Sequence, residues 1–107
     1  MTRTGTKLES NFQQEVIDFL TTKGAYVLKT HVSSFQKQGE PDITCCYLGR
    51  YVAFELKRDK HEKPTALQEY KMRLIRNAGG IAMRVDSLKE VEEVLNEIFR
   101  IQQDCKS

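Results

Sequence analysis

Two short runs of strand-forming residues, separated by a turn signal, constrain this chain most. Asp42–Leu48 and Tyr51–Lys57 are rich in β-branched, aromatic and apolar residues, and Gly49-Arg50 lies between them. Such a pattern predicts an antiparallel β-hairpin with a tight turn. A hairpin fixes which side chains share a face of the sheet, so it decides where the polar residues of both strands point.

The register of this hairpin places three charged side chains on one face. The turn at Gly49-Arg50 puts Asp42 opposite Lys57. It also puts Thr44 opposite Glu55. Because cross-strand partners share a face, as do residues two apart, Asp42, Glu55 and Lys57 project from the same side. A slip of one residue would move Asp42 to the other face. The alternate positions should point into the core: Val52, Phe54 and Leu56.

The rest of the sequence alternates between helical and strand patterns. Helices are indicated by three capping-box patterns: Thr6-x-x-Glu9, Thr65-x-x-Gln68 and Ser87-x-x-Glu90. Two further strands are expected at Ala25–Thr30 and Ile81–Val85, and the tail from Gln102 should be frayed. The order αβββαβα predicts an α/β fold in which helices flank a mixed four-stranded sheet, with an extra C-terminal helix, all in one domain of residues 1–107.

The composition excludes several classes of protein. The chain has 107 residues and a net charge of +2, which permits nucleic-acid binding without requiring it. Since no apolar run is long enough for a membrane span or a secretion signal, we expect a cytoplasmic protein. The three cysteines, Cys45, Cys46 and Cys105, lack metal-site spacing, and the adjacent pair should point to opposite faces of its strand. Reduced thiols are the simplest interpretation.

The clustered acids and lysine suit the hydrolysis of a phosphodiester. Two neighbouring carboxylates repel each other and favour a hard cation between them, for which Mg²⁺ or Mn²⁺ is the usual choice. Such an ion lowers the pKa of bound water, while Lys57 orients that water and offsets charge at the phosphorus. Each part alone has a common structural explanation, because Glu-x-Lys is often a solvated ion-pair face and Pro-Asp a turn dipeptide. Their combination on neighbouring strands predicts a metal site.

Two further residues have alternative interpretations. Glu15 lies at the margin of the apolar stripe of the first helix, where it is either a third acid of the site or a surface-edge glutamate. Gln68 is the first side chain after the charged loop that can turn back to the site, but its position after Thr65 equally suits a capping box. The residues themselves leave both choices open.

The motifs that surround these acids resemble a known family. Gly39-x-Pro41-Asp42 and Glu55-x-Lys57, followed by Gln68, are similar to the VRR-NUC branch of the PD-(D/E)xK nuclease superfamily. The resemblance extends from Glu15 to Leu95 and implies a restriction-endonuclease-like αβββαβ core. Archaeal Holliday-junction resolvases and restriction enzymes are other branches of that superfamily, and the Pro-Asp spacing together with Gln68 favours VRR-NUC.

The resemblance implies a role for each site residue. The metal ligands would be Asp42, Glu55, the backbone carbonyl of Leu56 and, through water or at a second ion, Glu15. Lys57 would be the catalytic lysine, and Gln68 would lie near the site as well as capping its helix. No organic cofactor is implied.

The resemblance also implies a substrate and an assembly. Stand-alone proteins of this type resemble small viral and bacterial nucleases that tend to form homodimers, which predicts the cytoplasm of a bacterial or virus-infected cell. A dimer with two sites suits structure-selective cleavage of branched DNA such as a Holliday (four-way) junction. Candidate phosphate contacts are Lys37, Arg58, Lys60, His61, Lys63 and Lys71, with Arg73 and Arg76 as second choices.

Some alternatives for assembly and function stay open. Tyr70 and Met72, or the final helix, are candidate dimer surfaces, although core or edge packing is commoner for such residues. A sequence-specific restriction or nicking endonuclease is one alternative function. A catalytically silent nucleic-acid-binding module of the same fold is the other.

Overall fold

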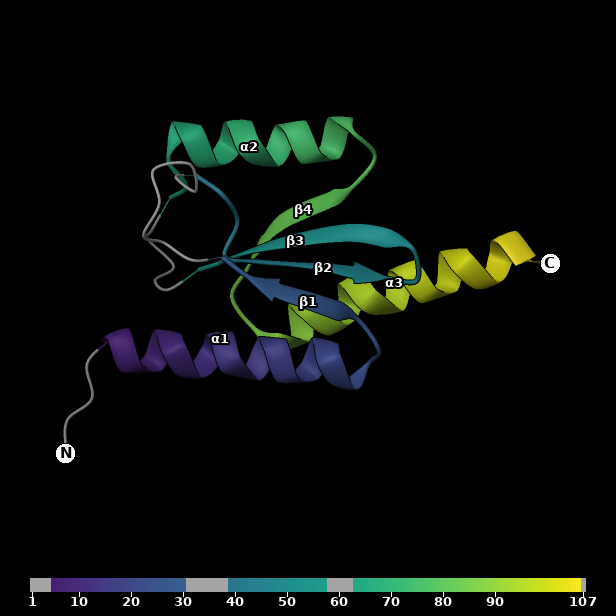
Figure 1. The fold of residues 1–107 in the computed structure, drawn as a ribbon, viewed down its shortest axis with the longest axis horizontal. Coiled ribbons are helices and arrows are strands. Elements are labelled where there is room, and N and C mark those ends of the chain that lie inside the picture. Colours follow the sequence, from purple (N-terminus) through teal and green to yellow (C-terminus); the bar gives the residue numbers. More distant parts are fainter. Residues whose placement is uncertain (1–4, 31–38, 58–62, 107) are drawn as a thin grey trace.

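The helices and strands follow one another in the predicted order (Figure 1). A computed structural model describes residues 5–30, 39–57 and 63–106, with the side chains of α1 described from residue 11 onward. The elements are α1 (Gly5–Thr22), β1 (Tyr26–Lys29), β2 (Ile43–Tyr47), β3 (Arg50–Leu56), α2 (Ala66–Asn77), β4 (Ile81–Val85) and α3 (Leu88–Lys106).

The four strands form one mixed sheet in the order β1-β2-β3-β4. β1 pairs with β2 and β2 with β3 in antiparallel fashion, whereas β3 and β4 are parallel because α2 crosses over between them. This arrangement confirms the predicted α/β class, the mixed sheet and the additional C-terminal helix.

The turn between β2 and β3 differs from the predicted one. Leu48 and Gly49 form it, with φ angles of 51° and 82°, so both residues are left-handed, as a two-residue hairpin turn requires. Tyr47 therefore pairs with Arg50, and Thr44 lies opposite Ala53 rather than Glu55. The predicted Gly49-Arg50 turn is therefore wrong by one residue, and the predicted pairing of Asp42 with Lys57 is wrong by two. Because the shift is even, each side chain keeps its predicted face.

The main core fills the space between one face of the sheet, α1 and α3. Its buried members include Val16 and Leu20 from α1, Ile43, Val52, Phe54, Leu56 and Val85 from the sheet, and Val91, Leu95 and Ile98 from α3. The predicted inward positions Val52, Phe54 and Leu56 are confirmed. Since each fully buried aliphatic or aromatic side chain stabilises the fold by about 1.5–3 kcal/mol, this layer supplies most of the stability.

On the opposite face of the sheet, α2 is the one described helix, and it lies over β3 and β4 (Figure 1). Met72 from the helix packs against Ala53 and Ala82, with Ile75 beside them. The two alanines leave room for the helix to lie close to the sheet. Met72 is 2% exposed, so its candidate role as a dimer surface is wrong, and it belongs to this small second core.

The ends of two helices differ from expectation. α1 begins at Gly5, ahead of the predicted cap Thr6, and the capping contacts predicted for Thr6 and Glu9 lie outside the described side chains. α3 continues to Lys106 rather than fraying at Gln102, and Arg100 pairs with Glu97 and Asp104 across its last turns. Thr65 and Ser87 do accept from Gln68 N and Glu90 N, as predicted.

None of the helices among the described residues has the length and apolar character to cross a bilayer.

Replacing Gly39 with alanine should destabilise the protein more than the same change at Gly24. Both glycines have positive φ, but a Cβ at Gly39 would lie 2.5 Å from Cγ of Leu67, whereas a Cβ at Gly24 meets nothing within 4 Å. The clash should cost about 1–3 kcal/mol beyond the backbone strain that both variants share. Urea unfolding of the two variants measures the difference, and equal losses would contradict this account of Gly39.

The thiol of Cys45 should resist labelling in the folded protein. Cys45 is buried and Cys46 exposed, which confirms that the pair points to opposite faces. Burial, with a smaller effect from Cys46, raises the pKa of Cys45 to about 11. Because the thiolate is the reactive form, roughly one Cys45 in a thousand is reactive at pH 8. Ellman's reagent should titrate two thiols quickly and the third after unfolding. Rapid reaction of Cys45 in the folded protein, seen by peptide mapping, would contradict this expectation.

Candidate metal and catalytic site

Asp42 precedes β2 and is held by both neighbouring strands. Its backbone carbonyl accepts from the amide of Thr30, at 2.9 Å, which extends the pairing with β1. Its carboxylate accepts from the amide of Leu56, at 2.8 Å, which fixes the side chain beside β3. Continuing the β2–β3 register by one residue places Asp42 opposite Glu55. The structure therefore brings the two predicted acids into one cross-strand row, closer than the predicted pairing would have placed them.

Glu55 is the one charged side chain that is buried in the described part of the chain, with 5% of its surface exposed. A buried carboxylate is costly unless polar groups bind it. Gln68 donates to it from Nε2 at 2.9 Å, so α2 supplies one of the groups that stabilise the acid. Among the described residues, every buried side-chain nitrogen or oxygen has a hydrogen-bond partner.

Gln68 has both of the roles that its sequence position suggests. Its side-chain oxygen Oε1 accepts from the backbone amide of Thr65 at 2.8 Å, and its backbone amide donates to Thr65 Oγ1 at 3.1 Å. These two hydrogen bonds form a capping box. The side-chain NH₂ group of the same residue reaches Glu55. Since one planar side-chain amide contacts both Thr65 and Glu55, the start of α2 fixes the position of the Glu55 carboxylate.

Lys57 follows β3 directly, two residues after Glu55. Its amide donates to the carbonyl of Val85 at 2.8 Å, which continues the parallel pairing with β4. Its Nζ lies 3.5 Å from a carboxylate oxygen of Asp86, and the two side chains are 27% and 47% exposed. A partly exposed pair at this distance is weak, so the ammonium group can exchange this partner for another anion. Asp86 was not among the predicted site residues.

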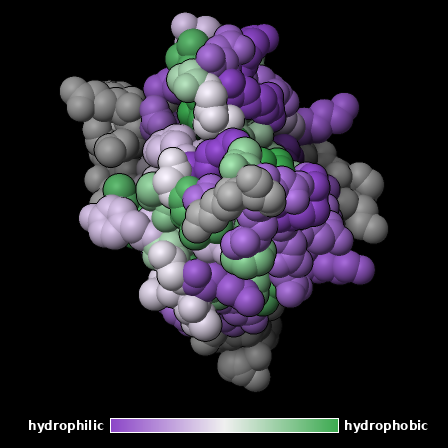
Figure 2. Space-filling view, turned by 90° about the vertical axis from the view of Figure 1, so that its right-hand side faces the viewer, coloured by the Kyte–Doolittle hydropathy of each residue, from purple (hydrophilic) through white to green (hydrophobic). Residues whose placement is uncertain are grey.

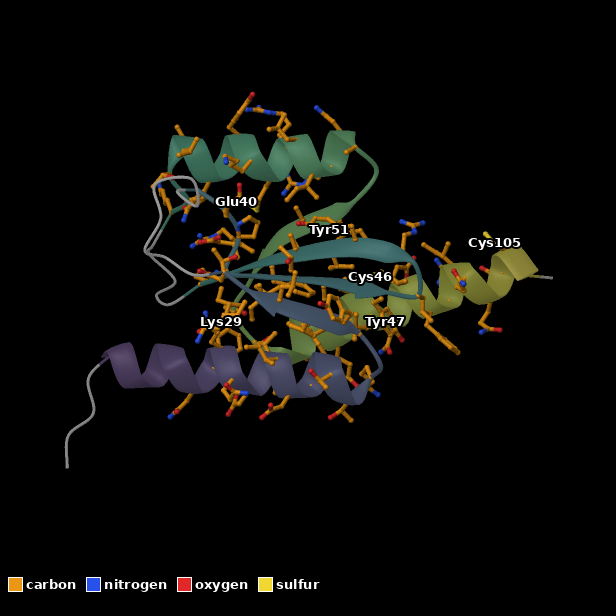
Figure 3. The ribbon with its side chains drawn as sticks, in the orientation of Figure 1. Lys29, Glu40, Cys46, Tyr47, Tyr51 and Cys105 are labelled. Carbon is orange, nitrogen blue, oxygen red and sulfur yellow. The ribbon has the colours of Figure 1, made fainter. Side chains whose placement is uncertain are left out.

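Glu40 and Lys71 form an ion pair that the sequence analysis did not anticipate. The Nζ of Lys71 lies 2.8 Å from Glu40, so the Gly39-x-Pro41 segment is tied to α2. Figure 3 shows Glu40 between the end of the sheet and that helix. Two opposite charges separated by 31 positions in sequence give no local signal. Lys71 must leave this pair to bind a phosphate, and its predicted role there stays a prediction.

Arg84 is a further residue beside the acids that was not predicted to belong to the site. It lies on β4 directly beside Glu55 in the parallel register, and it is partly buried. Neighbouring residues of paired strands share a face, so the side chain of Arg84 lies on the same face of the sheet as the buried Glu55. One charged residue within the apolar strand Ile81–Val85 was the available signal.

The other predicted site residues are less closely connected. Glu15 is exposed on α1, which packs on the opposite face of the sheet from α2. The described residues contain no group of three or more His, Cys, Asp or Glu placed to hold one metal ion, so the structure does not bring Glu15 together with Asp42 and Glu55. Lys63 is exposed near the start of α2. Four predicted phosphate contacts lie outside the described residues: Lys37, Arg58, Lys60 and His61.

Comparisons with known proteins bear on the fold. No protein-family model matches the sequence, and no curated protein matches it. A solved structure described as a VRR_NUC domain is similar to this chain, with a TM-score of 0.68 and 25% sequence identity over 82% of this chain and 94% of that chain. The chain has the fold of a VRR_NUC domain. The predicted resemblance and the nuclease-type fold are thereby confirmed.

In this VRR_NUC fold, replacing Gln68 with alanine should destabilise the protein more than replacing Thr65. Thr65→Ala removes one capping contact, worth about 1 kcal/mol. Gln68→Ala removes the reciprocal contact and also the amide that donates to the buried Glu55 carboxylate, so we expect a loss of about 2–3 kcal/mol. Urea unfolding at neutral pH measures both free energies. If the two losses were equal, the contact between Gln68 and Glu55 would contribute nothing to stability.

Proposed function

We propose that this chain is a divalent-metal-dependent DNA endonuclease that hydrolyses phosphodiester bonds. The observation that carries the proposal is the row formed by Asp42 and Glu55, with Lys57 two residues further along the same face. The likeness to a VRR_NUC domain supports the nuclease class and DNA as the substrate. The double role of Gln68 holds the acid in place, and the weak ion pair of Lys57 leaves its ammonium group able to turn to a substrate.

The residues present fit a hard divalent ion. Asp42 and Glu55 offer neighbouring carboxylate oxygens, and Gln68 and the Leu56 amide, which donate hydrogen bonds to them, hold these groups in position. We propose that Asp42, Glu55 and the carbonyl of Leu56 bind Mg²⁺ or Mn²⁺. Because Glu15 is exposed on α1, on the other face of the sheet, its part in the metal site stays a prediction. When bound, the ion lowers the pKa of a coordinated water and neutralises charge on the phosphate.

The protein's own groups would orient the reaction. Lys57 leaves Asp86 to orient the attacking water and to offset negative charge at the phosphorus. Gln68, which donates to Glu55, would hold that carboxylate in place for the ion. Arg84, beside Glu55, adds positive charge on the same face.

The substrate and the assembly form a finer part of the proposal. We propose that the enzyme selects branched DNA, with the four-way junction as the leading candidate, and acts as a homodimer. Two active sites related by a two-fold axis suit two strands of a junction. Lys63 and Lys71, with the predicted Lys37, Arg58, Lys60 and His61, are proposed to bind phosphates.

The proposal predicts metal-dependent cutting of labelled DNA. A four-way junction, a flap, a splayed arm, a plain duplex and a single strand are incubated with MgCl₂ or MnCl₂, and EDTA should abolish cleavage. Lys57→Ala and Asp42→Asn should each reduce the rate by at least about a hundredfold, because each removes a group that acts on the transition state. The amide introduced by Asp42→Asn retains a carbonyl oxygen that can accept from Leu56, so that variant should fold normally while its Mn²⁺ affinity, measured by calorimetry, falls.

Lys89→Ala is the matched control, because Lys89 is an exposed lysine on α3. It should cut at the wild-type rate. Cleavage of an unbranched duplex at one sequence would contradict structure selectivity and would favour a restriction-type endonuclease. Binding without cleavage of any substrate, unaffected by Asp42→Asn, would overturn the enzyme proposal in favour of a silent binding module.

A further inference from the structure

Three rows of side chains cross the face of the sheet on which α2 lies. The row that contains Asp42 and Glu55 is followed, two residues along β2, by Thr44 beside Leu28 and Ala53. Two residues further along, Cys46 pairs with Tyr26 on one side and Tyr51 on the other. All these side chains share one face because the two-residue period is unbroken between Asp42 and Cys46.

On this face α2 leaves β1, β2 and the start of β3 uncovered. Tyr26 is 71% exposed, Leu28 55% and Tyr51 49%, and Cys46 is also exposed. We call these four residues the tyrosine face. Figure 2 shows pale and green side chains along the left of the molecule, which is the front of the Figure 1 view, where β1 lies. Figure 3 shows Tyr51 and Cys46 on the α2 side of the sheet and Tyr47 on the α1 side.

The distance from the acids to the tyrosine face matches a short stretch of nucleic acid. Asp42 and Cys46 are four residues apart on an extended strand, which corresponds to about 13 Å. Stacked nucleotides rise about 3.4 Å each, so roughly four of them would span that distance. A strand whose phosphate lies at the acidic row can therefore place its bases over Tyr26 and Tyr51.

The chemistry of the face suits bases better than a protein partner. None of its four residues carries a carboxylate. Exposed aromatic rings beside a site for phosphates are typical of proteins that bind unpaired strands by stacking. The four side chains expose on the order of 400 Å², about half of what each partner buries in a stable dimer.

We propose that the tyrosine face binds unpaired nucleotides of a DNA strand that runs along β1 and β2 towards Asp42 and Glu55. This rests on the proposed nuclease function for the direction of the strand, and it deepens that function by adding unpaired DNA beside the cut to the substrate. Tyr26 and Tyr51 stack on bases, and Leu28 packs against their edges.

The test measures binding of a fluorescein-labelled twelve-residue oligothymidylate by anisotropy, in EDTA so that cleavage is not involved. Tyr26→Ala and Tyr51→Ala should each weaken binding about tenfold, the usual contribution of one stacked base. Tyr26→Phe keeps the ring and should bind like the wild type. Phe99→Ala is the matched control, because Phe99 is 49% exposed but lies on α3, which packs on the other face of the sheet. Circular dichroism establishes that each variant is folded.

Two outcomes would overturn the inference. The first is unchanged oligothymidylate binding in both tyrosine variants, or an equal loss in Phe99→Ala. The second is a wild-type dimer that becomes a monomer in Tyr26→Ala, as measured by sedimentation, while the affinity for oligothymidylate is unchanged. That result would make the face an interface between two copies of the chain. The assay is independent of the nuclease proposal. If the tyrosine variants lose oligothymidylate binding but the wild type cleaves no substrate, the tyrosine face is supported and the nuclease proposal is overturned. If the wild type cleaves DNA but the tyrosine variants bind normally, the nuclease proposal is supported and the tyrosine face is overturned.

Discussion

The register of β2 against β3 is the constraint on which the acidic row depends. It is set at the turn, where Leu48 adopts a left-handed conformation that costs a non-glycine residue about 1–2 kcal/mol. Five residue pairs of the hairpin offset this cost, and the contact from the Leu56 amide to Asp42 fixes the far end. A slip by one residue would bury Asp42 in the apolar core and expose the residues that now fill it.

The burial of Glu55 couples the stability of the fold to the geometry of the site. A buried carboxylate needs polar groups around it. The side-chain amide of Gln68 is one of them, and it reaches Glu55 because Thr65 caps the start of α2. Gly39 lets the segment before Asp42 pass against Leu67 of the same helix, and Lys71 pairs with Glu40 beside it. The start of α2 is thus held against both acids, so a change in its position would alter the site as well as the packing.

The element order and the faces of the strands could be predicted from the sequence because both depend on local periodicity and capping. The exact turn could not, since nothing in Leu48 signals a positive φ and Gly49-Arg50 was an equally reasonable turn. The error moved the pairing by two residues and left the faces unchanged.

The contacts that depend on tertiary structure could not be predicted. These are the ion pair of Glu40 with Lys71 and the place of Arg84 beside Glu55. For Met72 the helical pattern left both a dimer surface and core packing open, because its partners Ala53 and Ala82 are distant in sequence.

The two faces of the sheet have different physical requirements. One face is closed by α1 and α3 around large aliphatic and aromatic side chains, so any charge placed there would be desolvated without partners. The other face is closed by one helix over small residues, and this leaves room for Glu55 to be buried at the edge of the helix and for β1 and β2 to remain open. Because α2 covers only half of its face, the acids lie at the boundary between a packed region and an exposed one. At such a boundary Gln68 and the Leu56 amide can hold the two carboxylates in place, and the exposed region beside them is where the proposed DNA substrate would approach.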